Sequence, residues 1–154
     1  MNRKNKKTFA EKAYTTTQVD YSQTQVRIID MLHELGIMNT RITQSGDDYV
    51  VEFLVALREN EGARKVRINV PVNYEDWMTP KRRERERDKT FRVLFYNLKN
   101  RFVSVTNHLR EFEEEFLSDL VIMNNGKEMR VGDLIAPKYK EMLKDGKVAV
   151  MHLQ

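Results

Sequence analysis

The sequence contains no cysteine, six glycines and three prolines among its 154 residues. Without cysteine, disulfides, thiolate metal sites and cysteine nucleophiles are all excluded. The glycines are too sparse for a phosphate-binding loop. No apolar run approaches the roughly 18 residues of a membrane span, and none follows the basic start of the chain as in a secretory signal. We therefore expect a cytoplasmic protein that does not enter a membrane.

Recognisable catalytic signatures are also missing. The three histidines, His33, His108 and His152, lack the spacing of a zinc site, and no serine lies in a G-x-S-x-G turn. Carboxylates cluster at 111–119, where they either stabilise a helix start through its dipole or hold Mg²⁺. We expect no catalytic residue, metal or cofactor; a magnesium-dependent nuclease using Glu114 and Glu115 is a third hypothesis.

The composition is that of one globular domain. Apolar residues make up 40% of the chain and charged residues 32%, with a formal net charge of +4. Residues 1–20 form a basic tail that we expect to be flexible, because they offer little apolar surface to offset the entropy of ordering. Residues 21–154 are expected to form a single domain.

A helix and three strands are predicted first. Ser22 and Gln25 have the spacing of a capping box, and Gly36 fits the position after a helix end, so the helix should span Ser22–Leu35. Its expected buried residues, at helical spacing, are Val26, Ile29, Leu32 and Leu35. Strands are predicted at Thr40–Thr43, Tyr49–Leu57 and Arg64–Val70, with turns at 45–48 and 59–62.

The third strand alternates strictly. Val66, Ile68 and Val70 should face a core, while Lys65, Arg67 and Asn69 face solvent. Strands followed by helices favour an α+β fold: an N-terminal helix, a three-stranded antiparallel meander, a long amphipathic helix, then short helices and a small C-terminal hairpin.

A long helix should begin with Thr79 as its cap and Pro80 at its first position. One apolar stripe is predicted along it, at Phe91, Leu94, Phe95, Leu98, Phe102, Val105 and Leu109. An acidic helix at 111–120 should follow, then a hairpin whose strands, 121–123 and 129–131, flank Asn124-Asn125-Gly126. A short helix after Pro137 and an apolar end at 148–153 complete the chain.

The basic start of the long helix carries the most specific chemistry. A cationic row recurs at spacings of three, four and seven residues, which places it on one helix face, adjacent to the apolar stripe. Such rows bind phosphate backbones. The predicted nucleic-acid-binding residues are Arg82, Arg85, Lys89, Arg92, Tyr96 and Lys99, with Lys65 and Arg67 extending the surface. In the alternative interpretation, Arg82–Glu86 and Arg85–Asp88 pairs simply solvate an exposed helix.

The C-terminal half carries a further pattern: Phe112-Glu113-Glu114-Glu115-Phe116-Leu117, Asn125-Gly126, Val131-Gly132-Asp133, Pro137 and Asp145-Gly146-Lys147-Val148. It resembles the ending of an uncharacterised family of small phage and prophage proteins; this chain departs from the pattern around Trp77. The resemblance implies a mobile-element origin, often among early or DNA-metabolism genes, and no catalytic residues. Phe112, Phe116 and Leu117 are expected in the core, and Gly126 and Gly132 in turns.

The leading hypothesis is a phage-type accessory protein that binds nucleic acid without catalysis, reading the backbone through its arginine-rich helix. DNA is the expected partner rather than RNA, in replication or recombination. The alternative is a protein-interaction module, either a homo-oligomer or an inhibitor of a host protein, in which the basic and acidic helices are complementary surfaces.

Overall fold

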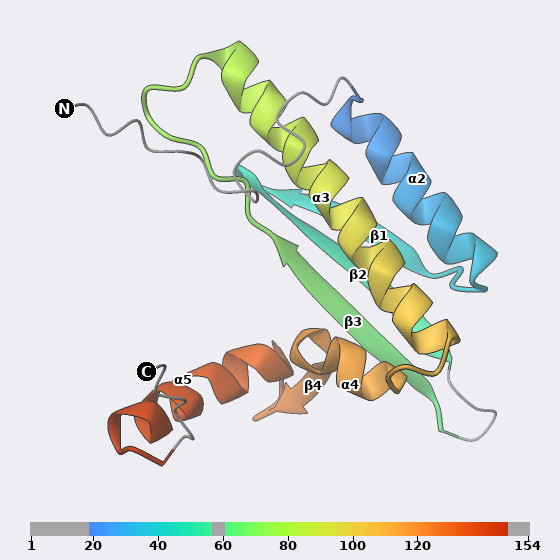
Figure 1. The fold of residues 1–154 in the computed structure, drawn as a ribbon, viewed down its shortest axis with the longest axis vertical. Coiled ribbons are helices and arrows are strands. Elements are labelled where there is room, and N and C mark those ends of the chain that lie inside the picture. The colour runs from blue at the N-terminus through green and yellow to red at the C-terminus, as the bar shows by residue number, and fades with distance from the viewer. Residues whose placement is uncertain (1–18, 57–60, 148–154) are drawn as a thin grey trace, which may run out of the picture.

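A computed structural model describes residues 19–56 and 61–147, and it has an α+β fold (Figure 1). The elements follow the order α2 (Tyr21–Glu34), β1 (Thr40–Ser45), β2 (Asp48–Ala56), β3 (Ala63–Val70), α3 (Pro80–Thr106), α4 (Phe112–Phe116), η1 (Leu117–Asp119), β4 (Val121–Asn124), β5 (Lys127–Arg130) and α5 (Val131–Lys144). The expected tail, the turn at 59–60 and the apolar end at 148–153 lie outside the described residues, apart from residues 19 and 20.

The three strands form an antiparallel meander in the order β1-β2-β3, as predicted. Phe53 in the middle strand pairs with Thr40 on one side and Val66 on the other. Because side chains alternate along a strand, Val51, Phe53 and Val66 point to one face and are almost fully buried there. The sheet therefore has one apolar face that must be covered.

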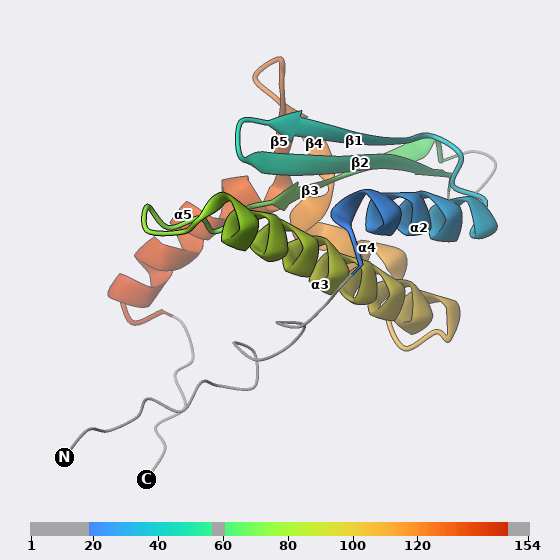
Figure 2. The ribbon, with the colours of Figure 1, turned by 90° about the horizontal axis from the view of Figure 1, so that it is seen from above.

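Helices α2 and α3 both lie on that face of the sheet (Figure 2). Thr79 caps α3 by accepting the N–H of Arg82, and Pro80 occupies the first turn, as predicted. The stripe of Phe91, Leu94, Leu98 and Phe102 is buried. Leu109 was expected to continue the stripe, but it is 77% exposed because α3 ends at Thr106. Within the described ranges, no helix has both the length and the apolar character to cross a membrane.

Helix α2 starts one residue before the predicted position. Asp20 is its cap and accepts the N–H of Ser22 at 2.8 Å, so Ser22 is not the capping residue. The buried residues are Thr24, Ile28 and Leu32, whereas Val26 is 57% exposed. The predicted inward face was therefore wrong except at Leu32. Gly36 does follow the helix with a positive φ of 80°.

The C-terminal elements gather along the β3 side of the sheet (Figure 1). Phe112 and Phe116 of α4 are buried, and the Phe116 ring contacts Phe53 and Phe102, so α4 closes one end of the core. Leu117 was expected in the core, but it is 49% exposed at the start of η1.

The predicted hairpin is confirmed: β4 pairs with β5 across Asn125 and Gly126, which both have positive φ. The helix after it begins at Val131 rather than after Pro137, which lies inside α5. Gly132 belongs to this helix, not to a turn. A Cβ atom at Gly132 would lie 2.8 Å from the carbonyl oxygen of Ser118, so glycine permits close packing of α5 on η1.

We predict that Gly132→Ala lowers the free energy of unfolding by about 1–3 kcal/mol, because the backbone at Ser118 has to move to admit the new methyl group. Urea unfolding of the variant and the parent measures this. Lys138→Ala, an exposed change on the same helix, is the matched control and should stay within about 0.5 kcal/mol of the parent. Equal stability of the alanine-132 variant and the parent would contradict the close approach.

Candidate nucleic-acid interface

Helix α3 carries a strong positive charge. It contains nine Lys or Arg residues and three Asp or Glu residues, so its net charge is 9 − 3 = +6. The first buried residue of the helix is Phe91, and the residues from Pro80 to Thr90 are exposed or partly exposed. The basic N-terminal turns thus extend beyond the apolar stripe that holds α3 to the sheet.

The predicted cationic row lies on side chains of α3 that are exposed or half-buried, away from the buried stripe. Arg85 and Lys99 are exposed and make no hydrogen bond or ion pair with residues in the described ranges. Arg82 stands over the ring of Trp77, at 5.0 Å from its centroid. These three cations are open to a ligand.

The other members of the row have partners within the protein. Lys89 pairs with Glu86 at 2.9 Å. Arg92 donates to the hydroxyl of Tyr96 at 3.1 Å and lies over its ring. Both cations are half-buried, and their partners hold the two side chains in place. They add to the positive charge of this helix face but are less available for direct contact with a ligand.

The interleaved carboxylates do not form the pairs expected of a merely solvated helix. Glu86 holds Lys89 rather than Arg82. Asp88 accepts the backbone N–H of Tyr21 at 2.9 Å, at the start of α2. Burial raises the pKa of Asp88, and the hydrogen bond from Tyr21 offsets part of this. Two of the three acidic residues of α3 are therefore engaged within the fold.

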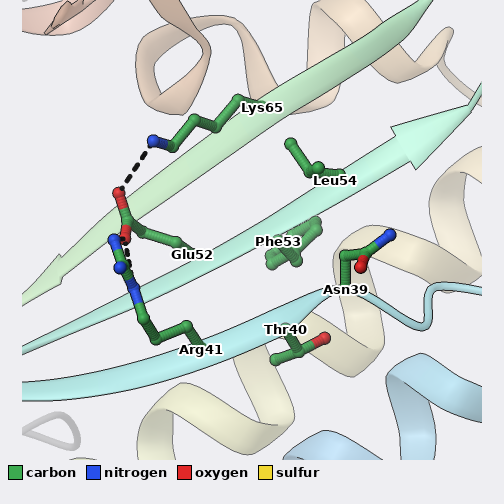
Figure 3. A pocket seen from close by; sticks show the side chains of 7 residues that line it. All are labelled: Asn39, Thr40, Arg41, Glu52, Phe53, Leu54 and Lys65. Atoms are coloured by element: carbon green, nitrogen blue, oxygen red, sulfur yellow. Dashed lines mark hydrogen bonds and ion pairs between the residues drawn. The ribbon is translucent and has the colours of Figure 1, made fainter.

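Lys65 and Arg67 are not part of the same surface. They lie on the face of the sheet opposite the helices, where both contact Glu52 and Glu128. Figure 3 shows Glu52 between Lys65 and Arg41 on this outer face. Since the sheet separates them from α3, these two cations cannot extend the cationic row, contrary to the expectation from sequence.

Glu52 is the centre of this outer-face network, with only 8% of its surface exposed. Burial by itself raises the pKa of the carboxyl, but hydrogen bonds from Arg41 and Arg67 and the charge of Lys65 outweigh it. Together they lower the pKa of Glu52 to about 2. Three cations and two carboxylates hold one another in this network, and Arg41, Glu52 and Lys65 line a pocket of about 350 Å³ on the outer face (Figure 3).

Several carboxylates of the acidic segment at 111–119 are also engaged in contacts within the protein. Glu111 and Glu114 form a reciprocal cap at the start of α4. Arg101 of α3 pairs with Asp119 at 2.9 Å and lies near Glu115. Among the described residues, no group of three or more His, Asp or Glu side chains is arranged to hold a metal ion. Glu115 and Asp119 thereby connect the C-terminal elements to α3.

An apolar surface remains on α5. The helix buries none of its residues, and Ile135, Tyr139 and Met142 are each more than 40% exposed. Ile135 and Tyr139 line a shallow groove of about 430 Å³ against Leu117. This groove offers exposed apolar side chains, whereas the cationic row offers exposed positive charge.

Comparisons with protein families, with curated proteins and with solved structures find no match to this chain. The resemblance to small phage and prophage proteins therefore stays a prediction based on the motifs.

Two features of the site were missed by sequence reasoning. The Trp77–Arg82 contact joins the loop before α3 to the first turn of that helix, across the capping residue Thr79. The only signals for it in the sequence were the five-residue spacing and the fact that the chain has a single tryptophan. The Glu52 network depends on strand register, since Glu52 pairs with Arg41 and Arg67 on neighbouring strands. Alternation of apolar and polar residues in all three strands would have indicated that register. It would not have predicted the contact of Glu128, because this residue belongs to a separate hairpin.

We predict that Glu52→Gln lowers the free energy of unfolding at pH 7. The same change should make this free energy fall less steeply as the pH is lowered. A carboxyl whose pKa falls from 4.5 to about 2 on folding stabilises the protein above pH 4.5, and this contribution is lost as the pH falls towards 2. It amounts to at most about 3 kcal/mol. Urea unfolding at about pH 7 and pH 3 should therefore show that the free energy of unfolding decreases less between these two pH values in the variant than in the parent. An equal decrease in both proteins would contradict the role of Glu52.

Proposed function

We propose that this protein binds nucleic acid without catalysis through the solvent side of α3. The observation that carries the proposal is the open set of Arg82, Arg85 and Lys99 on a helix of net charge +6. Contacts to phosphates release condensed counterions, so a row of exposed cations favours a polyanionic backbone over a small acidic ligand. A guanidinium also offers paired donors and a flat face.

The contacts of α3 support this proposal over a purely structural role for its charges. A solvated helix would pair its arginines with the carboxylates one turn away. Here Asp88 instead accepts the N–H of Tyr21, and Glu86 holds Lys89, so Arg82 and Arg85 keep their charge available. We place the protein among phage-type accessory proteins of DNA metabolism on the motif resemblance alone.

The salt dependence of binding tests the proposal. The variant Arg82→Ala/Arg85→Ala/Lys99→Ala should bind DNA at least about tenfold more weakly at low salt, and its plot of log K against log[salt] should be shallower by about 3. Fluorescence anisotropy of a labelled oligonucleotide measures both.

The matched control removes three positive charges elsewhere. Lys138, Lys140 and Lys144 are exposed on α5, and changing them to alanine leaves the row intact. This variant should keep the slope of the parent. If both triple variants lose affinity equally, net charge rather than the row accounts for binding; if the parent protein does not bind at low salt, the proposal fails.

A second candidate function is self-association, and the exposed apolar side chains of α5 favour it. The earlier idea of complementary basic and acidic helices has less support, because Glu115 and Asp119 already pair with Arg101. A contact through Ile135, Tyr139 and Met142 would be apolar and would persist in high salt.

Light scattering at about 1 M salt, where exposed charges are screened within about 3 Å, tests this second candidate. A dimer would have twice the mass of one chain, and Tyr139→Lys should convert it to a monomer. Met123→Lys, at an exposed apolar residue of β4, is the control and should leave the mass unchanged. A parent protein that is monomeric at high concentration would contradict self-association.

A further inference from the structure

The loop between β3 and α3 presents the single tryptophan of the chain to solvent. Trp77 is 60% exposed, although it is the largest apolar side chain available for burial. Its position follows from the capped start of α3, because Thr79 and Pro80 fix the direction in which the loop enters the helix. The ring therefore lies at the basic end of α3.

The exposed ring is held in place by two polar contacts. Its indole N–H donates to the carboxylate of Glu75. The guanidinium of Arg82 lies 5.0 Å from the ring centroid, within the range of a cation–π contact. A ring fixed at one edge and on one face loses little further entropy when a flat ligand stacks on it.

A second aromatic–arginine pair anchors the same loop. Arg83 lies 5.4 Å from the ring centroid of Tyr74, which is half-buried. Burial raises the pKa of the Tyr74 phenol, despite the nearby charges of Arg87 and Arg83. Tyr74 thus attaches the loop to the body of the protein, and Trp77 is the ring that remains exposed.

The charges around Trp77 favour an anionic ligand. Its own loop contributes two carboxylates, Glu75 and Asp76, and Glu75 accepts the indole N–H. The first two turns of α3, from Pro80 to Arg87, add five cations and two carboxylates, an excess of 5 − 2 = +3 that exceeds the two loop carboxylates: Lys81, Arg82, Arg83, Arg85 and Arg87 against Glu84 and Glu86. The phosphates of a nucleic acid would bind these cations while one of its bases contacts the ring of Trp77.

We infer that the Trp77–Arg82 pair is a stacking site for one base of a single-stranded nucleic acid, an inference that rests on the proposed function of α3. Aromatic rings beside cations bind single strands because every unpaired base has a free face. Bases inside a duplex are already stacked, and parting them for a side chain costs free energy. The site therefore selects single strands over duplexes.

Trp77 itself reports the binding, since no other tryptophan contributes emission. Oligo(dT) and oligo(U) of about 20 nucleotides, long enough for several contacts, should each quench its fluorescence in a saturable titration at low salt. A duplex of the same length should bind more weakly and cause little quenching. The two oligonucleotides compare DNA with RNA at one site.

Trp77→Leu removes the ring and should weaken binding of labelled single strands by about fivefold or more, measured by anisotropy, with little effect on duplex binding. Trp77→Phe keeps a stacking face and should restore most of the affinity. Because the ring is exposed, both variants should match the parent in circular dichroism and thermal unfolding.

The outcomes separate this inference from the proposed function. Salt-dependent binding of oligonucleotides with no change in Trp77 emission, and with equal affinity for the Trp77→Leu variant, would overturn the stacking site but leave the role of α3 intact. No binding of any nucleic acid at low salt would overturn both. A shift of Trp77 emission with protein concentration alone would place the ring in a protein interface and also overturn the stacking site.

Discussion

The apolar stripe of α3 against the inner face of the sheet is the contact on which the other elements depend. Without it, Val51, Phe53 and Val66 would face water, and α2 and α4 would lose their packing partner. The stripe begins only at Phe91, eleven residues after Pro80. The preceding turns contribute little to the core, so their composition is free to serve another purpose, and they carry most of the basic residues of the helix.

Positive charge is used in two ways in this fold. Arg67 and Arg101 are largely buried and joined to carboxylates, where they connect strands and helices distant in sequence. Arg82 and Arg85 form no ion pair with a carboxylate of the described residues. An exposed ion pair adds little stability, so folding alone neither requires nor forbids the open cations of α3.

The sequence was sufficient where the determining contacts were local. The α3 stripe apart from Leu109, the Thr79 cap and the Asn125-Gly126 turn were correctly predicted, because helical spacing, capping and positive φ depend on neighbouring residues. It failed on the inward face of α2, which has apolar residues on several sides, so that packing against α3 selects Ile28 over Val26. The pairing of Lys65 with Glu128 joins residues 63 positions apart, which no local pattern records.

The hydrogen bond from Tyr21 to Asp88 spans 67 residues, and this separation matters during synthesis. A ribosome delivers α2 and all three strands before it reaches the first buried residue of α3. In that interval the apolar face of the sheet lacks the cover of α3, and the start of α2 lacks its hydrogen-bond acceptor. Nascent chains halted there would expose aggregation-prone surface, so folding to completion waits on the emergence of one helix.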